Sequence, residues 1–382
     1  MKKIAFIAGV FFPDAGGAQV QCHNVANQLS DMGFKVDCYT FKKTSNLSSK
    51  YTTILINRVI LKLVFISNYY LGCNLDFILT FYLKRIIKKK SYDTWHFHFI
   101  NYKSLLIINS LKKLNQKIFV TFQGIDIQIN KEIKYGYRLN PNYQKLLNKT
   151  LNKIDIFFNI SQTIKEDLIN LGVEDNKIIF FPNLVKTEKF QELIKEKKKN
   201  NKIKLVTIAR YAPKKKGYDF LPLLADILIK KSINFEWTIV GSGTSELKKN
   251  HIIKKNFKMF NILENIDNKD EMYFPHSKLI HIYNESDLYI NLARVESFGI
   301  TFIEALASGI PIITFDSLGA NEIILNNKNG IIIKEWSLNR MAIELLNLMN
   351  DNKKLKEMKN NCLNDARRYS LKTNLEKLKY LY

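Results

Sequence analysis

The chain begins with an alternation of short apolar runs and longer amphipathic segments. Residues 4–10 form an apolar run, and residues 18–34 then place apolar side chains at near-helical spacing before Gly33. The first pattern predicts a buried strand, and the second predicts a helix that ends at a glycine. A second apolar run at 35–41 predicts the next strand. This order of strand, helix and strand indicates a parallel sheet with helices on both faces.

The same alternation continues, stops at a charged segment and then restarts. Before the charged segment, strands are predicted at 94–100, 117–122, 154–161 and 177–183. The charged segment starts at Glu188, and its middle, 195–201, predicts a solvated boundary. After it, strands are predicted at 204–210, 234–243, 287–293 and 311–316, with a helix at 300–309. We therefore expect two α/β domains of the doubly wound type, at residues 1–190 and 191–365, and a final helix within 366–382.

Charge is the unusual property of the composition. Among 382 residues, 59 are Lys or Arg and 35 are Asp or Glu, which gives a net charge of +24. This excess suits an anionic membrane, a nucleic acid or an anionic small substrate. It also suits an ordinary lysine-covered surface, because the chain is rich in Lys, Ile and Asn together. No RNP-like or helix-turn-helix motif accompanies the lysines, so we expect no nucleic-acid partner.

The sequence also bears on location. No run reaches the ~18 uninterrupted apolar residues of a membrane-spanning helix. Residues 77–90 combine aliphatic and aromatic side chains with five basic ones. They predict either a helix on an anionic membrane surface or a core-packed helix with a wet basic end. Four cysteines without a C-x-x-C pair favour a reducing compartment. We expect a cytoplasmic protein, at most peripheral on the inner face of the membrane.

The segment 296–311 holds two carboxylates, Glu296 and Glu304, on either side of Gly299. On one continuous helix they would be ~12 Å apart, which exceeds the ~5–9.5 Å of a paired-carboxylate hydrolase. A better placement leaves Glu296 in a loop and starts the helix near Gly299 or Ile300. The free N–H groups of that helix start suit a phosphate, and Glu304 can accept hydrogen bonds from hydroxyls. The pattern fits a nucleotide sugar; the alternative is an amphipathic helix with two exposed acids.

These residues also carry a family resemblance. The stretch ESFGITFIEALASGIPII, from Glu296, resembles the E-x7-E signature of the retaining GT-B glycosyltransferases of family GT4. The resemblance implies two Rossmann-like domains that face each other across a cleft, with a last helix that crosses back to the first domain. It implies that Glu304 holds the donor ribose and that Glu296 lies by the transferred sugar. The backbone between them would contact the sugar and diphosphate, at Ser297, Phe298, Gly299, Ile300 and Thr301.

Other segments match the same family. ARYAPKKKGYD, from Ala209, resembles its G-R-x(4)-K-G-x-D motif, in which Arg210 and Lys216 would clamp the donor diphosphate. One extra residue precedes Lys216, so Lys215 is the other candidate for this role; the alternative for all three lysines is a solvated turn. Two glycine loops also resemble family segments that lie near the donor, and their glycines are Gly16, Gly17, Gly241 and Gly243.

The first domain departs from the family at one position. Many members have a histidine near the transferred sugar where this chain has Gln123, which cannot take a proton at neutral pH. A positioning role for Gln123, with Asp126 nearby, fits this substitution. His98 resembles another family histidine at the end of a strand; the alternative is a histidine whose ring nitrogens are hydrogen-bonded in the core or behind the site. No D-x-D motif is present, and the nearest pattern is a D-x-x-D at 267–270.

Together these features predict an enzyme that transfers a hexosyl-type sugar from a UDP- or GDP-sugar to a glycan or lipid-linked glycan, retaining configuration. Its catalytic residues would be Glu296, Arg210 and Lys216, with no metal and no cofactor besides the nucleotide-sugar substrate. The resemblance implies a role in surface polysaccharide synthesis, such as lipopolysaccharide, O-antigen or capsule. The alternative is a non-catalytic basic protein on the same scaffold, which binds membrane or nucleic acid.

Overall fold

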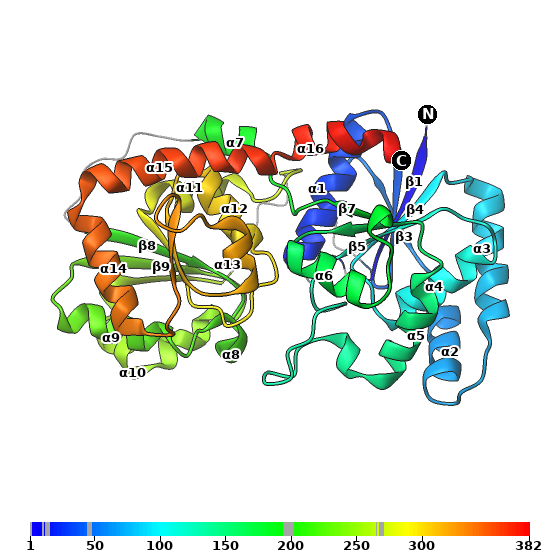
Figure 1. The fold of residues 1–382 in the computed structure, drawn as a ribbon, viewed down its shortest axis with the longest axis horizontal. Coiled ribbons are helices and arrows are strands. Elements are labelled where there is room, and N and C mark those ends of the chain that lie inside the picture. Colours follow the sequence, from blue (N-terminus) through cyan, green and yellow to red (C-terminus); the bar gives the residue numbers. More distant parts are fainter. Residues whose placement is uncertain are drawn as a thin grey trace. The chain divides into compact units, whose positions relative to one another are not determined.

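The computed structural model divides the chain into two compact units (Figure 1). It describes residues 2–9, 11, 16–43, 48–193, 202–264, 266 and 271–382. Unit 1 comprises Met1–Asn183 and Leu371–Tyr382, and unit 2 comprises Leu184–Ser370. The solvated boundary predicted at 195–201 lies outside the described residues.

Seven parallel strands form the sheet of unit 1, in the order β3-β2-β1-β4-β5-β6-β7. The strands are β1 Lys3–Ala8, β2 Lys35–Thr40, β3 Thr52–Leu55, β4 Thr94–His98, β5 Ile118–Phe122, β6 Ile156–Asn159 and β7 Ile178–Phe180. Each strand predicted for this part of the chain is confirmed. The edge strand β3 was not predicted, because its four residues are largely exposed and form no apolar run.

Helices cover both faces of the sheet of unit 1 (Figure 1). They are α1 Gly17–Asp31, α2 Arg58–Tyr69, α3 Asp76–Lys90, α4 Tyr102–Lys112, α5 Pro141–Leu151, α6 Gln162–Asn170 and α16 Leu371–Leu378. The predicted stop at Gly33 is confirmed, because Gly33 follows α1 with a φ of +89°, where glycine is favoured.

The core of unit 1 includes residues from its C-terminal segment. His96 on β4 is fully buried, and its Nδ1 lies 2.8 Å from the Tyr382 hydroxyl. Its Nε2 lies 2.7 Å from Oγ1 of Thr121 on the neighbouring strand. Helix α16 packs against α1. The segment after residue 370 therefore completes the packing of unit 1.

Unit 2 contains a six-stranded parallel sheet in the order β10-β9-β8-β11-β12-β13. The strands are β8 Ile203–Ile208, β9 Phe235–Val240, β10 Phe260–Leu263, β11 Leu288–Asn291, β12 Ile312–Phe315 and β13 Gly330–Ile333. The four strands predicted for this half are confirmed, and they are the central ones. The two edge strands, β10 and β13, are four residues each and were not predicted.

Helices also flank the sheet of unit 2 (Figure 1). They are α7 Thr187–Leu193, α8 Pro213–Lys216, α9 Leu221–Lys230, α10 His251–Lys255, α11 Ser277–Glu285, α12 Ile300–Ala307, α13 Leu318–Ile323, α14 Leu338–Asn350 and α15 Asn352–Ala366. The core is centred on Trp237, whose indole N–H donates to Oγ1 of Thr207 over 3.0 Å. Its single polar atom is therefore satisfied inside the core.

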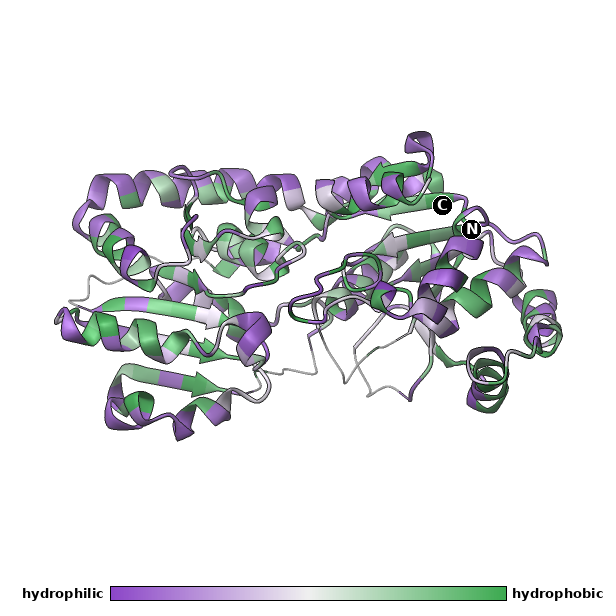
Figure 2. Ribbon diagram, turned by 60° about the horizontal axis from the view of Figure 1, so that its bottom comes forward, coloured by the Kyte–Doolittle hydropathy of each residue, from purple (hydrophilic) through white to green (hydrophobic). Residues whose placement is uncertain are grey.

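Hydropathy follows this architecture. Figure 2 shows hydrophobic residues concentrated on the strands and hydrophilic residues on much of the outer helical surface. Across the described ranges, no helix combines the length and apolar character needed to cross a bilayer.

Candidate functional site

Three loops of unit 2 carry most of the predicted donor-binding residues. They follow β8, β9 and β11, which are neighbours in the sheet. Because parallel strands point the same way, these loops lie at one edge of the sheet, where ligands of doubly wound folds bind. The sequence therefore brings the predicted donor-binding residues of this half to one edge of unit 2.

An ion pair joins two of these loops. Nζ of Lys216, at the end of α8, lies 2.6 Å from Oε2 of Glu296, which follows β11. Their side chains are only 18% and 15% exposed, so solvent screens this pair less than a surface pair. The predicted alternative of two exposed acids is wrong for Glu296 and, as described below, for Glu304.

A second ion pair, between Arg294 and Asp219, joins the same two loops. The guanidinium of Arg294 donates to both carboxylate oxygens of Asp219, over 2.7 and 3.0 Å. It also stacks 3.9 Å above the ring of Phe220, and the Arg294 backbone N–H donates to the Lys215 carbonyl. Burial opposes ionisation of Asp219, but the bidentate Arg294 lowers the pKa of that carboxyl. Sequence reasoning did not select this pair, although Asp219 is the last residue of the matched K-G-x-D motif.

Lys215 lies in the same charged region. Burial lowers the pKa of Lys215 to about 8; Lys216 and Arg210 add to the shift, and Glu296 opposes it. Lys214, by contrast, is 84% exposed. The solvated-turn alternative therefore describes only Lys214, and Lys215 and Lys216 belong to a basic cluster with Arg210.

Glycines permit the close approach of these loops. Gly241 ends β9 with a φ of +151°, and a Cβ there would lie 2.0 Å from the carbonyl oxygen of Ala209. Gly217 has a φ of +69°, and a Cβ there would lie 1.8 Å from the carbonyl oxygen of Leu292. Only glycine fits either position without backbone movement. Gly243 caps the 3₁₀ turn Thr244–Lys249, also with positive φ.

The loop after β11 leads into the start of α12, as predicted. Gly299 is the N-cap residue with a φ of +90°, and no side chain caps the first N–H groups. The helix begins at Ile300 and therefore presents free N–H groups and its positive dipole end. The Phe298 side chain is buried, with its ring 6.1 Å from that of Tyr369, and Ser297 is buried as well. At Phe298 only the backbone is therefore free to contact a ligand.

Glu304 lies one turn inside α12 and is 5% exposed. Its Oε2 accepts a hydrogen bond from the Tyr283 hydroxyl over 2.8 Å. Burial raises the pKa of Glu304 to about 7, although the Tyr283 hydrogen bond opposes the shift. Thr301, one turn before, has its hydroxyl 2.9 Å from that of Tyr289. Neither tyrosine carried a sequence signal, because both lie on elements that precede the matched stretch.

A further contact closes the loop that carries Glu296. The Gly319 N–H, which follows β12, donates to the Glu296 carbonyl over 2.7 Å. A Cβ on Gly319 would lie 2.6 Å from the Phe298 carbonyl oxygen. Gly319 therefore fixes the backbone between the two glutamates.

The predicted residues of unit 1 lie at the carboxyl ends of strands. His98 ends β4, and both its ring nitrogens are buried without a hydrogen-bond partner among the described residues. Burial lowers the pKa of His98 to about 3, so the ring is neutral. Gln123 follows β5, and its Nε2 is buried and unpartnered within the same set of residues. The core alternative for His98 is right about its burial but wrong about its hydrogen bonds.

Asp126 shapes its own loop. Its carboxylate accepts from the backbone N–H groups of Gly124 at 2.9 Å, Gln123 at 3.0 Å and Ile100 at 3.3 Å. Burial raises the pKa of Asp126 to about 7 against these hydrogen bonds. Asp126 thus ties the loop after β5 to the loop after β4, and so holds Gln123 relative to His98.

The glycine loop predicted at the start of unit 1 is described in part. Gly16 is the extended N-cap of α1, and Gly17 is its first residue; no side chain caps the helix start. Residues 12–15 of this loop lie outside the described residues, as does the D-x-x-D pattern at 267–270. Among the residues described, no three His, Cys, Asp or Glu side chains gather as metal ligands would.

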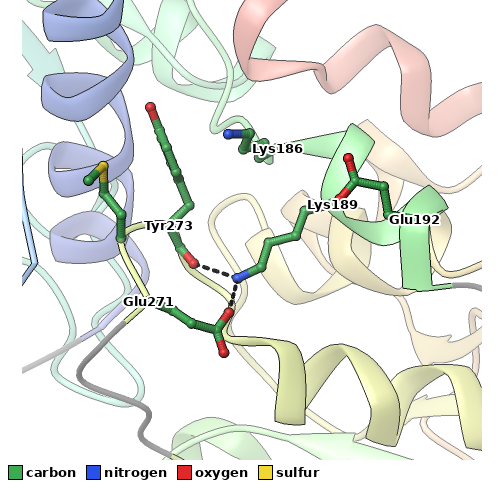
Figure 3. A pocket seen from close by; sticks show the side chains of 6 residues that line it. Lys186, Lys189, Glu192, Glu271 and Tyr273 are labelled. Atoms are coloured by element: carbon green, nitrogen blue, oxygen red, sulfur yellow. Dashed lines mark hydrogen bonds and ion pairs between the residues drawn. The ribbon is translucent and has the colours of Figure 1, made fainter.

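One hollow of unit 2 contains none of the predicted residues. Figure 3 shows Lys189 pointing to Glu271 and to the Tyr273 carbonyl, with bonds of 2.5 and 2.9 Å. Lys186 lies 4.0 Å above the Tyr273 ring, and the hollow has a volume of about 260 Å³. Burial opposes ionisation of Glu271, but the Lys189 and Ser277 hydrogen bonds lower the pKa of that carboxyl to about 2. These contacts stabilise the start of unit 2.

Comparisons with known proteins agree with this geometry. Residues 187–365 match the family model "Glycosyl transferases group 1", and residues 15–189 match "Glycosyltransferase Family 4". A phosphatidylinositol N-acetylglucosaminyltransferase GPI3 subunit of Saccharomyces cerevisiae is 21% identical over 343 residues, which is 85% of this chain and 70% of that protein. An N-acetyl-alpha-D-glucosaminyl L-malate synthase of Bacillus anthracis is 20% identical over 352 residues, 89% of this chain and 86% of that one.

A solved structure supports the fold. The structure of Anabaena HepE in complex with UDP and glucose superposes with a TM-score of 0.71 at 14% identity, and the match covers 100% of this chain and 99% of that one. The fold class predicted from the sequence, two Rossmann-like α/β domains of GT-B type, is therefore confirmed. With two matching family models that together span residues 15–365, the chain belongs to the GT-B glycosyltransferases.

Proposed function

We propose that the chain is a retaining glycosyltransferase that moves a hexosyl-type sugar from a UDP- or GDP-sugar to a hydroxyl acceptor. The observation that carries the proposal is the basic cluster of Arg210, Lys215 and Lys216, which lies beside Glu296. Glu296 itself lies in the loop that leads to the uncapped start of α12. Basic side chains and free N–H groups suit a diphosphate. Glu304, buried one turn further, is the candidate partner of the ribose hydroxyls.

In this proposal the basic cluster stabilises the leaving group. The bond between the anomeric carbon and the diphosphate oxygen breaks, and the diphosphate leaves with the electron pair. The oxygen of the acceptor hydroxyl bonds to the same carbon on the same face, which retains configuration, and its proton passes to the departing diphosphate oxygen. Arg210, Lys215 and Lys216 stabilise the charge that develops on the diphosphate, so we propose that no metal is needed. Glu296 holds the sugar, and Lys216 in turn holds Glu296.

The acceptor is proposed to be a glycan or a lipid-linked glycan. The name of the yeast relative gives phosphatidylinositol as an acceptor, and the name of the Bacillus relative gives an alpha-linked product. His98 and Gln123 in unit 1 have buried polar atoms that a bound sugar or acceptor hydroxyl can satisfy. We propose a cytoplasmic location, peripheral on the inner membrane face, and a role in the synthesis of a surface polysaccharide.

A donor panel tests the proposal. The purified full chain is incubated with UDP-glucose, UDP-N-acetylglucosamine and GDP-mannose, and binding and nucleoside diphosphate release are measured. We expect one donor to bind and Glu304→Ala to raise its dissociation constant, while Lys214→Met, at the exposed neighbour of the cluster, leaves it unchanged. If no donor binds, or if Glu304→Ala binds like the wild type, the proposal fails. Salt-sensitive nucleic-acid binding of micromolar or tighter affinity would then favour the non-catalytic alternative.

A further inference from the structure

Helices α2 and α3 form an antiparallel hairpin at the edge of unit 1 (Figure 1). The Asn57 N–H, at the start of α2, donates to the Tyr82 hydroxyl on α3 over 3.1 Å. Near the end of α2, the Asn68 side chain donates to Asp76, at the start of α3, over 3.2 Å. The connection 70–75 therefore forms the tip of a hairpin in which both ends of α2 are bonded to α3.

Helix α2 has two apolar faces. Leu61 and Val64 are buried against the rest of the unit. Val59, Leu63 and Ile66, at positions spaced by four and three residues, form a second stripe that is exposed. A helix that serves only to cover a core needs the first stripe and not the second.

Further exposed apolar side chains lie in the tip and on α3. Tyr70 and Leu71 in the tip are 69% and 67% exposed. Phe77 and Phe81, one turn apart on α3, are 67% and 57% exposed. We call the side chains of Val59, Leu63, Ile66, Tyr70, Leu71, Phe77 and Phe81 the hairpin surface. A groove of about 500 Å³ runs along it, lined mainly by the aliphatic members and by Leu75.

This concentration is unlike the rest of the chain. Of the nineteen large hydrophobic side chains that are exposed among the described residues, eight lie between residues 55 and 81. The other eleven are scattered over the remaining described residues. Single exposed hydrophobic residues need no explanation, but a contiguous group indicates a binding surface.

The charge of the same hairpin is strongly positive. Arg58, Lys62, Lys84, Arg85 and Lys88 are exposed, and none of them forms an ion pair within the described part of the chain. The one acidic residue between positions 52 and 90, Asp76, is buried. On the adjoining α4, burial lowers the pKa of the Lys103 ammonium, and nearby Arg58 and Lys62 lower it further. Positive charge is therefore concentrated beside the apolar stripe.

We propose that the hairpin surface docks on an anionic phospholipid bilayer. The apolar side chains enter the boundary between headgroups and acyl chains, and the basic side chains of the two helices bind lipid phosphates. A second copy of the chain fits less well, because two hairpins would bring unpaired positive charges together. Nucleic acid fits less well too, because it would leave the apolar stripe in water. The inference deepens the peripheral membrane location proposed above, on which it rests, and it does not depend on the transfer reaction.

Vesicle flotation of the purified full chain tests the inference without donor or acceptor. We expect binding to vesicles with about one third phosphatidylglycerol, weaker binding at high salt, and little binding to phosphatidylcholine alone. The double substitution Leu71→Ser with Phe77→Ser should weaken binding about tenfold or more. Lys84→Glu with Arg85→Glu should reduce the binding to anionic vesicles to a similar extent.

Matched controls come from unit 2. Leu223 and Phe257 are 51% and 64% exposed, so Leu223→Ser with Phe257→Ser removes comparable apolar area elsewhere. Lys254→Glu with Lys255→Glu, on α10, reverses the same number of charges. Both control variants should bind like the wild type. Equal loss in hairpin and control variants would overturn the inference, as would equal binding to neutral vesicles. The mass of each variant in lipid-free solution is also measured. If the wild type is oligomeric and only the hairpin variants have a lower mass, the surface serves self-association and the inference is overturned as well.

Discussion

The hydroxyl of Tyr283 donates a hydrogen bond to Oε2 of Glu304 over 2.8 Å, inside the packed layer between α11 and α12. This bond opposes the effect of burial, which raises the pKa of Glu304 to about 7. If Glu304 accepts hydrogen bonds from donor hydroxyls, donor binding needs its ionised form. We predict that donor affinity increases as the pH rises through about 7. Removing the bond with Tyr283→Phe should move this midpoint to a higher pH.

The measurement is the donor dissociation constant across pH 5.5 to 9, by calorimetry. Glu304→Gln is the control: an amide does not titrate, so the increase in affinity through about pH 7 should disappear. Only the decrease expected as Lys215, with a pKa of about 8, loses its charge should remain. An unchanged midpoint in Tyr283→Phe would show that Tyr283 does not set the ionisation of Glu304.

The same carboxyl should affect the stability of the free protein. Its folded-state pKa is raised, so between about pH 4.5 and 7 the folded protein binds the proton that the unfolded chain has lost. Stability should fall as the pH rises through this window. Glu304→Gln removes this loss. The free energy of unfolding of the variant, minus that of the wild type, should therefore be larger at pH 8 than at pH 4.5 by up to about 3 kcal/mol. Urea unfolding at both pH values measures the difference; a constant difference between the two proteins would contradict the prediction.

Substitutions of the three lysines of α8 should differ strongly in their effect on the rate of transfer. Lys216 is paired with Glu296, and Lys215 lies in the same half-buried cluster. We predict that Lys215→Met or Lys216→Met lowers kcat/KM by about 10²-fold or more, because each removes a charge that stabilises the leaving diphosphate. Lys214→Met, one residue away and 84% exposed, should retain nearly full activity. Equal losses at all three positions would instead indicate disruption of the whole turn.

Gly241 should be irreplaceable for structural reasons. An added Cβ would lie 2.0 Å from the Ala209 carbonyl oxygen, at a φ of +151°. We predict that Gly241→Ala lowers stability by about 2–4 kcal/mol, from the clash and the backbone strain together. Gly172→Ala is the matched control, because Gly172 also has positive φ but has open space around it; it should lose only about 1 kcal/mol. Chemical denaturation of both variants measures the comparison.

Asp126 should matter through the loop that it organises. Asp126→Ala leaves three backbone N–H groups, two of them buried, without their acceptor. We predict a stability loss of about 2–4 kcal/mol. Asp126→Asn keeps one acceptor oxygen and should recover part of it. A loss of activity in Asp126→Asn with unchanged stability would assign the carboxylate a direct role in acceptor binding instead.

The sequence predicts the central strands and the start of α12, because apolar runs and Gly299 report local structure directly. It does not predict β3, β10 or β13, because a stretch of four residues is too short for its pattern alone to distinguish a strand from a loop. The edge strand β7 is predicted because it lies within a longer apolar run, 177–183.

Within the site, the pattern selects Glu296, Glu304 and the lysines. It cannot select Tyr283 as the partner of Glu304 or the pairing of Arg294 with Asp219, because these contacts join elements up to 75 positions apart in the sequence. It also cannot tell that Lys215 is half-buried while Lys214 is solvated, since both are lysines in one turn.

The division of unit 1 into two segments has a consequence for biosynthesis. Its first segment ends at Asn183, and its second begins at Leu371, after the whole of unit 2. On the ribosome, unit 2 can therefore complete its sheet before α16 emerges. Until then the α16-facing side of α1 remains uncovered, and His96 lacks Tyr382. Unit 1, although it starts first, is the last to finish folding, and in a nascent chain stalled before residue 371 this side of α1 would remain accessible to chaperones.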